Sequence, residues 1–439
     1  MSPIEGQKRL PARRRIGMLR VLRTLALVLL VLVSTGVGIA IGTSRDQSGD
    51  ATASTMLASM PEFDVVEETY DLIRSHYVLS DDVTDEQLMY GAASGMVASL
   101  GDTNHSTFLD PTEAKDFTRE LNGELIGIGV HIDLTGPLPV IIAPVDGSPA
   151  WEAGIQPGDV IISVDGVESA GTDPQEVTDL IRGEEGTDVT LVLRHRGADT
   201  TYTVTITRSK ITLKPVSYMM MPDNVLWLRI ARFSTGTTDG VREAIAWGKE
   251  HGMTGMVLDL RNNPGGYTNE AIGVTGQFLP AGSVAYKEQL ADGTVTDRVT
   301  EATDGAWLEG DMAVLINGGS ASSAEIVSSA LRDNGRAELY GETTVGTGTV
   351  LNLFELSDGS MAVLGTKLWL TANGSEIWKV GVDPDVEVSL PDDDFPVLPL
   401  EFDGHELTAE QLAESGDVQL QAGFDAVSGA DALSSTPAA

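Results

Sequence analysis

The chain has 439 residues and a formal net charge of −37, from 65 acidic and 28 basic residues, and it contains no cysteine. This length accommodates two or three globular units, and a hydrophobic content of 41% excludes disorder as a description of the whole chain. The absence of cysteine excludes disulfide bonds, thiol catalysis and zinc–thiolate sites. The acidic balance argues against nucleic-acid binding, which needs clustered Lys and Arg.

The amino-terminal segment has the pattern of a membrane anchor. Residues 1–23 carry seven Lys and Arg against one Glu, and residues 24–42 carry no charge and are mostly apolar. This pattern predicts a basic cytoplasmic tail followed by one transmembrane helix. A cleaved secretory signal is the alternative, because residues 36–42 are rich in small side chains. Either interpretation places the rest of the chain outside the cytoplasmic membrane, so we expect a single-pass cell-membrane protein with an extracytoplasmic body.

The next part of the chain is predicted to be a linker and a helical segment. Residues 43–60 are small and polar, as in a flexible spacer. Within residues 61–121, apolar residues at helical spacing predict helices at about 63–77 and 85–100. A turn-rich connector that contains His105 follows.

Residues 122–212 are predicted to form a small, mostly β module. Short β-branched runs are separated by glycine turns, and Asp165-Gly166 indicates a hairpin. The expected elements are strands at 140–142, 160–164, 189–193 and 202–206 and a helix at 174–181.

Residues 213–391 alternate between strand and helix patterns, which predicts an α/β core with a partly parallel sheet and a site at its strand carboxyl ends. The expected strands are 225–230, 255–259, 312–316, 337–340, 350–355 and 360–364, and the expected helices are 238–250, 269–278 and one from Ser322 to 332. Residues 392–439 are acidic, with one last helix expected at 408–427 and a frayed end.

A glycine-led turn at 317–325 delivers Ser322 to the start of a predicted helix. Unpaired N–H groups at a helix N-terminus can hold an oxyanion, so Ser322 has the placement of a nucleophile. The structural alternative is a capping box, in which Ser322 and Glu325 satisfy helix donors.

A second motif, at 258–266, directly follows a predicted buried strand. Its glycines, Gly265 and Gly266, can present N–H groups to a developing oxyanion, or they can simply form a tight strand-to-helix turn.

Two further motifs complete a resemblance. Residues 126–130 with 158–161 resemble the carboxylate-binding loop and following strand of PDZ domains, and residues 341–350 form a Gly/Thr-rich loop before a strand. In this order, together with 357–360 and 381–385, the motifs resemble the carboxy-terminal processing peptidases, which are membrane-associated or exported serine proteases with an embedded PDZ domain. The resemblance covers residues 65–400. It implies a multi-domain α+β and α/β fold, in which a PDZ module precedes a crotonase-like, ClpP-type protease core.

The resemblance also implies roles for individual residues. Ser322 occupies the nucleophile position, and the oxyanion hole comprises the N–H of Ser323 and that of Gly265 or Gly266. The expected partners are protein or peptide substrates with exposed C-termini, the oligomeric state is left open, and neither a cofactor nor a metal is expected. The substrate carboxylate would be received by Gly127, Ile128, Gly129 and Val130.

One position departs from the family pattern. The family's usual general base is a lysine where this chain has Thr347, and a later Gln is Leu351 here. A threonine hydroxyl has no useful basicity near neutral pH. Either another residue is the base, or the chain is a catalytically inactive homologue that binds C-terminal peptides through its PDZ domain.

For a relocated base we consider His105. Residues 102–108 resemble the turn that supplies the catalytic histidine of tricorn-type relatives, whose triad is completed by a Glu, and Glu376 is the nearest acid in the right region. The alternative is a histidine that bonds only locally. Lys367 is expected to point away from the site. We therefore expect a membrane-anchored, extracytoplasmic serine endopeptidase that recognises and processes protein C-termini.

Overall fold

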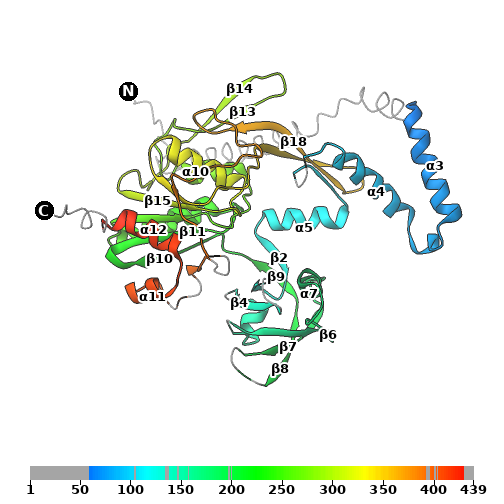
Figure 1. Cartoon of the computed structure of the whole chain (residues 1–439), viewed down its shortest axis with the longest axis horizontal. Helices are drawn as coiled ribbons and strands as arrows, with labels where there is room; N and C mark the ends of the chain where they lie inside the picture. Colours follow the sequence, from blue (N-terminus) through cyan, green and yellow to red (C-terminus); the bar gives the residue numbers. More distant parts are fainter. Residues whose placement is uncertain are drawn as a thin grey trace, which may run out of the picture. The chain divides into compact units, whose positions relative to one another are not determined.

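A computed structural model describes residues 59–102, 105–133, 138–145, 148–156, 158–195, 198, 200–391, 396–399, 402 and 404–429 (Figure 1). The predicted tail at 1–23, the membrane helix at 24–42 and most of the linker at 43–60 lie outside these residues. Within them, no helix has both the length and the apolar character needed to cross a membrane.

The chain divides into two units, Met1–Met89 and Tyr90–Ala439. In the first, the described residues form α3 (Pro61–His76), a short 3-10 turn η1 (Ser80–Asp82) and the start of α4 (Asp85–Ala98). These elements confirm the two helices predicted at 63–77 and 85–100.

Arg74 joins the end of α3 to the start of α4. Its guanidinium donates to the carbonyl oxygens of Ser80 and Val83, at 2.9 and 2.7 Å, and pairs with the carboxylate of Asp85. One cation therefore satisfies the carbonyls of the connecting turn.

The β module of the second unit is an antiparallel sheet in the order β3-β4-β5-β7-β8, with α7 (Pro174–Ile181) packed on it. Buried Val177 and Ile181 of α7 share one core with the sheet. Asp165 and Gly166, at φ 48° and 82°, form the predicted hairpin between β5 and β6. The strands are β3 (Val130–Asp133), β4 (Val140–Pro144), β5 (Val160–Val164), β6 (Val167–Glu168), β7 (Asp188–Arg194) and β8 (Thr201–Thr207).

Short elements border this sheet. The helix α6 (Pro149–Glu152) follows β4, and the antiparallel pair of β2 (Glu124–Gly127) and β9 (Ser209–Thr212) lies where the chain enters and leaves the module. The sequence patterns did not predict β2, β3, β6 or β9, because each has at most four residues.

The core sheet has the order β10-β11-β12-β15-β16-β19, antiparallel between β10 and β11 and parallel elsewhere. Every residue of β11 and β12 is buried, which explains why their sequences are nearly continuous apolar runs. The parallel arrangement predicted from strand–helix alternation is thus confirmed. The strands are β10 (Val216–Met221), β11 (Val225–Ile230), β12 (Gly255–Asp259), β15 (Asp311–Ile316), β16 (Glu338–Gly341) and β19 (Val386–Glu387), with a 3-10 turn η2 (Pro222–Asn224) after β10.

Helices cover both faces of this sheet. Alternate residues of β11 enter two different cores, Leu226 and Leu228 in one and Val225 and Trp227 in the other. The first core also contains α8 (Thr237–Glu250), α9 (Thr268–Thr275) and α10 (Ser323–Asp333), and the second contains α11 (Ala409–Glu414) and α12 (Val418–Ser428). The core is therefore a three-layer α/β/α arrangement (Figure 1).

A second sheet, entirely antiparallel, borders the core. The connector that contains His105 leads into it through a three-residue strand, followed by α5 (Pro111–Leu121). Its strands are β1 (Thr107–Leu109), β13 (Val284–Gln289), β14 (Val295–Val299), β17 (Thr349–Glu355) and β18 (Met361–Leu370).

The single helix predicted at 408–427 is wrong, because the structure has α11 and α12 there. Gly416 adopts φ 71°, which ends helical geometry, and the Asp417 carboxylate accepts the Leu420 N–H at 2.9 Å and so starts a new helix.

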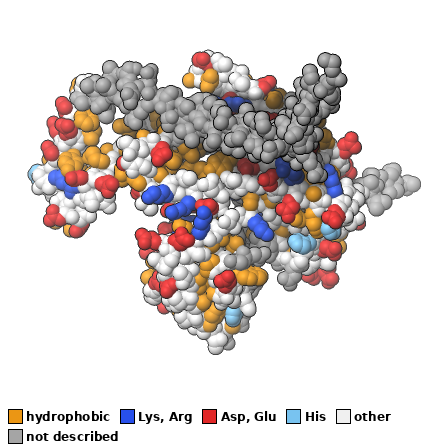
Figure 2. Space-filling view, turned by 180° about the vertical axis from the view of Figure 1, so that it is seen from behind, with side chains coloured by type: hydrophobic (Ala, Val, Ile, Leu, Met, Phe, Trp, Pro, Cys, Tyr) orange, Lys and Arg blue, Asp and Glu red, His pale blue; other side chains and the backbone are white. Residues whose placement is uncertain are grey.

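Acidic side chains are spread over the face of the molecule shown in Figure 2. Lys and Arg are fewer there, as the net charge of −37 requires. A solvated acidic surface of this kind is what the composition predicts.

Candidate active site

The site is centred on Ser322, between β15 and α10. Ser322 is half-buried and adopts φ 52° and ψ −114°, a conformation that is uncommon for a residue with a side chain. Such strain persists only where the surroundings hold it in place. The contacts of this turn therefore decide how the serine is presented.

The Glu325 carboxylate fixes the Ser322 turn through hydrogen bonds. Its buried carboxylate accepts the N–H of Ser322 at 2.7 Å, the N–H of Gly346 at 2.7 Å and the N–H of Thr347 at 3.0 Å. The hydroxyls of Thr344 and Thr347 donate to it as well. Five uncharged donors thus replace the water that a buried carboxylate loses.

Thr347 lies directly beside the Ser322 turn. Its Oγ1 accepts the Ser322 N–H at 2.7 Å while donating to Glu325. The capping box predicted for Ser322 and Glu325 is present, and the Glu325 carboxylate also joins the turn to the Gly/Thr-rich loop.

Three asparagines connect the loops around the serine, which follow β12 and β15. Asn317 Oδ1 accepts the Asn262 N–H at 2.8 Å, and its Nδ2 donates to Asn262 Oδ1 at 2.9 Å. The Asn263 carbonyl accepts the N–H of Ala321, and Asn263 Nδ2 donates to the Ile230 carbonyl. The carboxyl ends of adjacent parallel strands are therefore locked together at the serine, as predicted for an open α/β sheet.

These bonds bring the predicted oxyanion glycines to the serine. A Cβ on Gly265 would lie 2.6 Å from Ser322 Cβ, so only glycine permits this approach. The Gly265 N–H already donates to Asn263 Oδ1 at 2.9 Å, and Ser323 Oγ donates to the Gly266 carbonyl at 2.9 Å. Of the two glycine donors considered, Gly266 is thus better suited to accompany Ser323.

His105 lies just before β1, and the Gly/Thr-rich loop reaches it too. Its Nδ1 is 2.9 Å from Thr349 Oγ1, and its ring meets that of Trp378 edge-on at 4.8 Å between centroids. Burial lowers the pKa of His105 below its usual value, against the opposing effect of the charges on Asp102 and Glu325. The imidazole is therefore neutral near pH 7.

The structure does not bring Glu376 to this imidazole. Its side chain is exposed, and within the described residues it makes no hydrogen bond or ion pair, while its backbone forms a bridge with Leu370. Lys367 is also engaged elsewhere, because its Nζ donates to Glu288 at 2.6 Å.

The predicted carboxylate loop lies between β2 and β3. Gly129 adopts φ 78°, and a Cβ there would lie 2.4 Å from the Cβ of Ser148, whose hydroxyl donates to the Gly129 carbonyl. The Ile128 carbonyl accepts from Ala150, which fixes the loop from the other side. In the described part of the sheet β3 pairs with β4 alone, so its other edge can accept an added strand.

The sequence analysis missed a buried ion network behind the site. Arg261 is fully buried and pairs with Asp259 and Asp417, each at 2.8 Å. Burial raises the pKa of Asp259, but Arg261 and Arg229 outweigh it and hold that pKa below its usual value. Because Asp417 is 156 residues from Arg261, no local pattern signals the pair.

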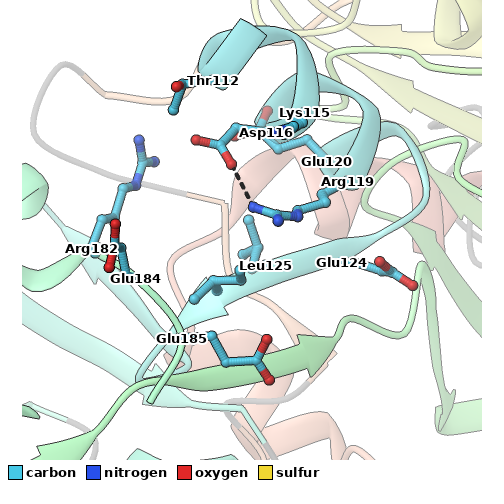
Figure 3. A pocket seen from close by; sticks show the side chains of 12 residues that line it. Thr112, Lys115, Asp116, Arg119, Glu120, Glu124, Leu125, Arg182, Glu184 and Glu185 are labelled. Atoms are coloured by element: carbon cyan, nitrogen blue, oxygen red, sulfur yellow. Dashed lines mark hydrogen bonds and ion pairs between the residues drawn. The ribbon is translucent and has the colours of Figure 1, made fainter. Parts of the chain in front are cut away.

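A cavity of about 550 Å³ lies among α5, β2 and the loop after α7 (Figure 3). Residues of both charge signs line it, including the ion pair of Arg119 with Asp116 at 2.8 Å. None of the predicted site residues contributes to its lining.

Comparisons with known proteins identify the α/β core and its embedded β module as parts of a PDZ-containing peptidase. Family models match peptidase family S41 at residues 224–388, a PDZ domain at 140–195 and the N-terminal domain of the activating protease CtpB at 39–112.

The chain is 34% identical over 388 residues to the carboxy-terminal processing protease CtpA of Bacillus subtilis, covering 88% of this chain and 78% of that protein. It is 32% identical over 373 residues to a carboxy-terminal-processing protease of Bartonella bacilliformis, covering 83% and 82%. The chain belongs to the carboxy-terminal processing protease family of S41 serine peptidases.

The fold also agrees with a crystal structure of a Bacteroides fragilis protein provisionally assigned to the S41 proteases. That protein is 21% identical, with a TM-score of 0.50, and the match covers 73% of this chain and 89% of that one.

Proposed function

We propose that this protein is a membrane-anchored, extracytoplasmic serine endopeptidase that captures exposed C-termini with its PDZ domain and cleaves the captured chain. The observation that carries the proposal is the strained turn of Ser322, with Gly265 packed against it and Glu325 fixing it to the Gly/Thr-rich loop. A serine that served only as a helix cap would not need this arrangement.

In the proposed reaction, Ser322 Oγ attacks the scissile carbonyl while His105 Nε2 takes the hydroxyl proton. The N–H groups of Ser323 and Gly266 stabilise the oxyanion, and the imidazolium returns the proton to the leaving amine. Water then hydrolyses the acyl-enzyme by the same proton route.

His105 is proposed as the base because Thr347 occupies the family's lysine position. The Thr347 hydroxyl is already committed to Ser322 N–H and Glu325, and it has no basicity to offer. The lowered pKa of His105 supplies a neutral acceptor at physiological pH.

Recognition of C-termini is proposed from the β module. The loop from Gly127 to Val130 lies at the start of an edge strand, and the family models assign this module to the PDZ domains. An extended peptide would add beside β3 with its carboxylate at the loop.

The proposed location rests on the sequence pattern of residues 1–42. A basic segment followed by nineteen uncharged residues is typical of a membrane anchor with its following domain outside.

A fluorophosphonate probe tests the enzyme proposal on the full-length protein in detergent. We expect labelling of wild type at Ser322, and loss of labelling in Ser322→Ala and His105→Ala. His251→Ala is the matched control, because among the described residues that side chain hydrogen-bonds to the Trp247 carbonyl alone and stacks on the Trp247 ring, and it should label normally.

A threonine rather than a lysine at position 347 favours a second candidate function. In that case the protein is an inactive homologue that only binds C-terminal peptides. A wild-type protein that binds such peptides but is neither labelled nor able to cleave casein would establish that function instead.

A further inference from the structure

We propose that Thr349 is the positioning residue for His105, and that its hydroxyl holds the imidazole in the orientation a base requires. The inference rests on the proposed role of His105. It assigns to a neutral hydroxyl the task that a carboxylate performs in a serine–histidine–acid triad.

The hydrogen bond between the two residues carries the inference. His105 Nδ1 and Thr349 Oγ1 are 2.9 Å apart. The threonine hydroxyl can donate or accept, so the contact fixes the orientation of the ring. In the tautomer whose Nδ1–H donates to the hydroxyl, Nε2 keeps the lone pair that accepts the serine proton. The opposite tautomer would present an N–H and could not act as a base.

Packing restricts the ring to this geometry. Trp378 contacts the imidazole edge-on, and a Cβ on Gly348 would lie 2.6 Å from Trp378 Cα. The Gly348 carbonyl accepts the Trp369 N–H at 3.0 Å, which fixes the backbone directly before Thr349. The ring therefore lies against a rigid loop and an aromatic side chain.

The same loop also holds the nucleophile. Thr347, two residues before Thr349, accepts the Ser322 N–H. A loop that in other family members supplies the lysine thus contacts the serine turn with one hydroxyl and the histidine with another.

The test compares Thr349→Val, which keeps the shape and removes the hydroxyl, with Thr349→Ser, which keeps the hydroxyl. We expect kcat for a peptide substrate to fall about 10- to 100-fold in Thr349→Val with KM changed by less than about twofold, since a general base contributes 10²–10⁴-fold. Thr349→Ser should remain within about threefold of wild type.

Thr366→Val is the matched control, because within the part of the chain that the structure describes the Thr366 hydroxyl makes one long hydrogen bond, 3.4 Å to the Val350 carbonyl. It should have wild-type kinetics. All assays use the full-length protein, and urea denaturation verifies that each variant is folded.

The outcomes separate this inference from the proposed function. A Thr349→Val enzyme with wild-type kcat, alongside an inactive His105→Ala, overturns the role of Thr349 and leaves the histidine base standing. Equal loss in Thr349→Val and Thr349→Ser also overturns it, because only the hydroxyl should matter. Full activity in His105→Ala overturns both the role of Thr349 and the role of His105 as general base.

Discussion

The backbone conformation of Ser322 bears on its chemical role. Its φ of 52° is uncommon for a residue with a side chain, and the strained turn is held by Glu325, Thr347 and the close approach of Gly265. Residue identities alone are consistent with both a capping box and a nucleophile. The strained conformation supports the proposed role of Ser322 as nucleophile.

Glu325 should be indispensable to this conformation. In Glu325→Gln, an amide NH₂ replaces one oxygen and meets donors from Ser322, Gly346 and Thr347, which leaves buried donors unsatisfied. We expect the free energy of unfolding to fall by about 2–4 kcal/mol, measured by urea denaturation, and fluorophosphonate labelling to be lost. A variant with unchanged stability and labelling would show that the turn is held by other contacts.

The pH dependence of cleavage should report His105. Only the neutral imidazole accepts a proton, and burial lowers its pKa, so kcat/KM should rise with pH through a midpoint below the usual 6.5. The measurement is a pH profile from 4.5 to 9 with a short peptide. A midpoint above pH 7 contradicts a buried histidine base and indicates an amine.

At the scale of elements, the two loops after β12 and β15 act as one unit. Gly265→Ala places a methyl 2.6 Å from Ser322 Cβ at φ 94°. Gly293→Ala is the matched control, since it has φ 83° but open space around it, and therefore isolates backbone strain from collision. We expect Gly293→Ala to lose about 1 kcal/mol of stability and to be labelled normally, and Gly265→Ala to lose more stability and also its labelling. Equal labelling of both would mean that the glycine approach is unnecessary.

The β module permits a parallel experiment. Gly129→Ala collides with Ser148, whereas Gly171→Ala, at φ 84°, meets nothing. We expect the first to lose at least tenfold in affinity for a fluorescent C-terminal peptide, by anisotropy, and the second to bind as wild type. Wild-type peptide affinity in Gly129→Ala would show that the loop at residues 127–130 does not bind the peptide.

Several elements were predictable because their local patterns are strong. The buried strands β11 and β12 were predicted with the bounds the structure shows, as continuous apolar runs. All five residues of β14 are exposed, so it has no apolar pattern and was missed. The helix α5 was also missed, although Asp110 and Glu113 form a capping box.

At the scale of the whole molecule, α12 is tied to the active-site loops by a buried charge network. Asp417→Asn should leave Arg261 underpaired in the core and lower the free energy of unfolding by about 3–5 kcal/mol, measured by denaturant titration. The exposed pair of Asp239 with Arg242 is the control, and Asp239→Asn should cost at most about 1 kcal/mol. Equal losses of stability in Asp417→Asn and Asp239→Asn would show that the buried charge network stabilises the protein no more than an exposed ion pair does.

The sequence by itself determined the family, the parallel core and the serine turn, because glycine spacing, capping patterns and apolar runs are local and survive without coordinates. Only the tertiary structure decided which groups surround the serine and the histidine. Thr349 is 244 residues from His105, and Arg261 is 156 residues from Asp417. Such contacts are set by how strands and loops pack, and packing sums many weak interactions that no short stretch of sequence records.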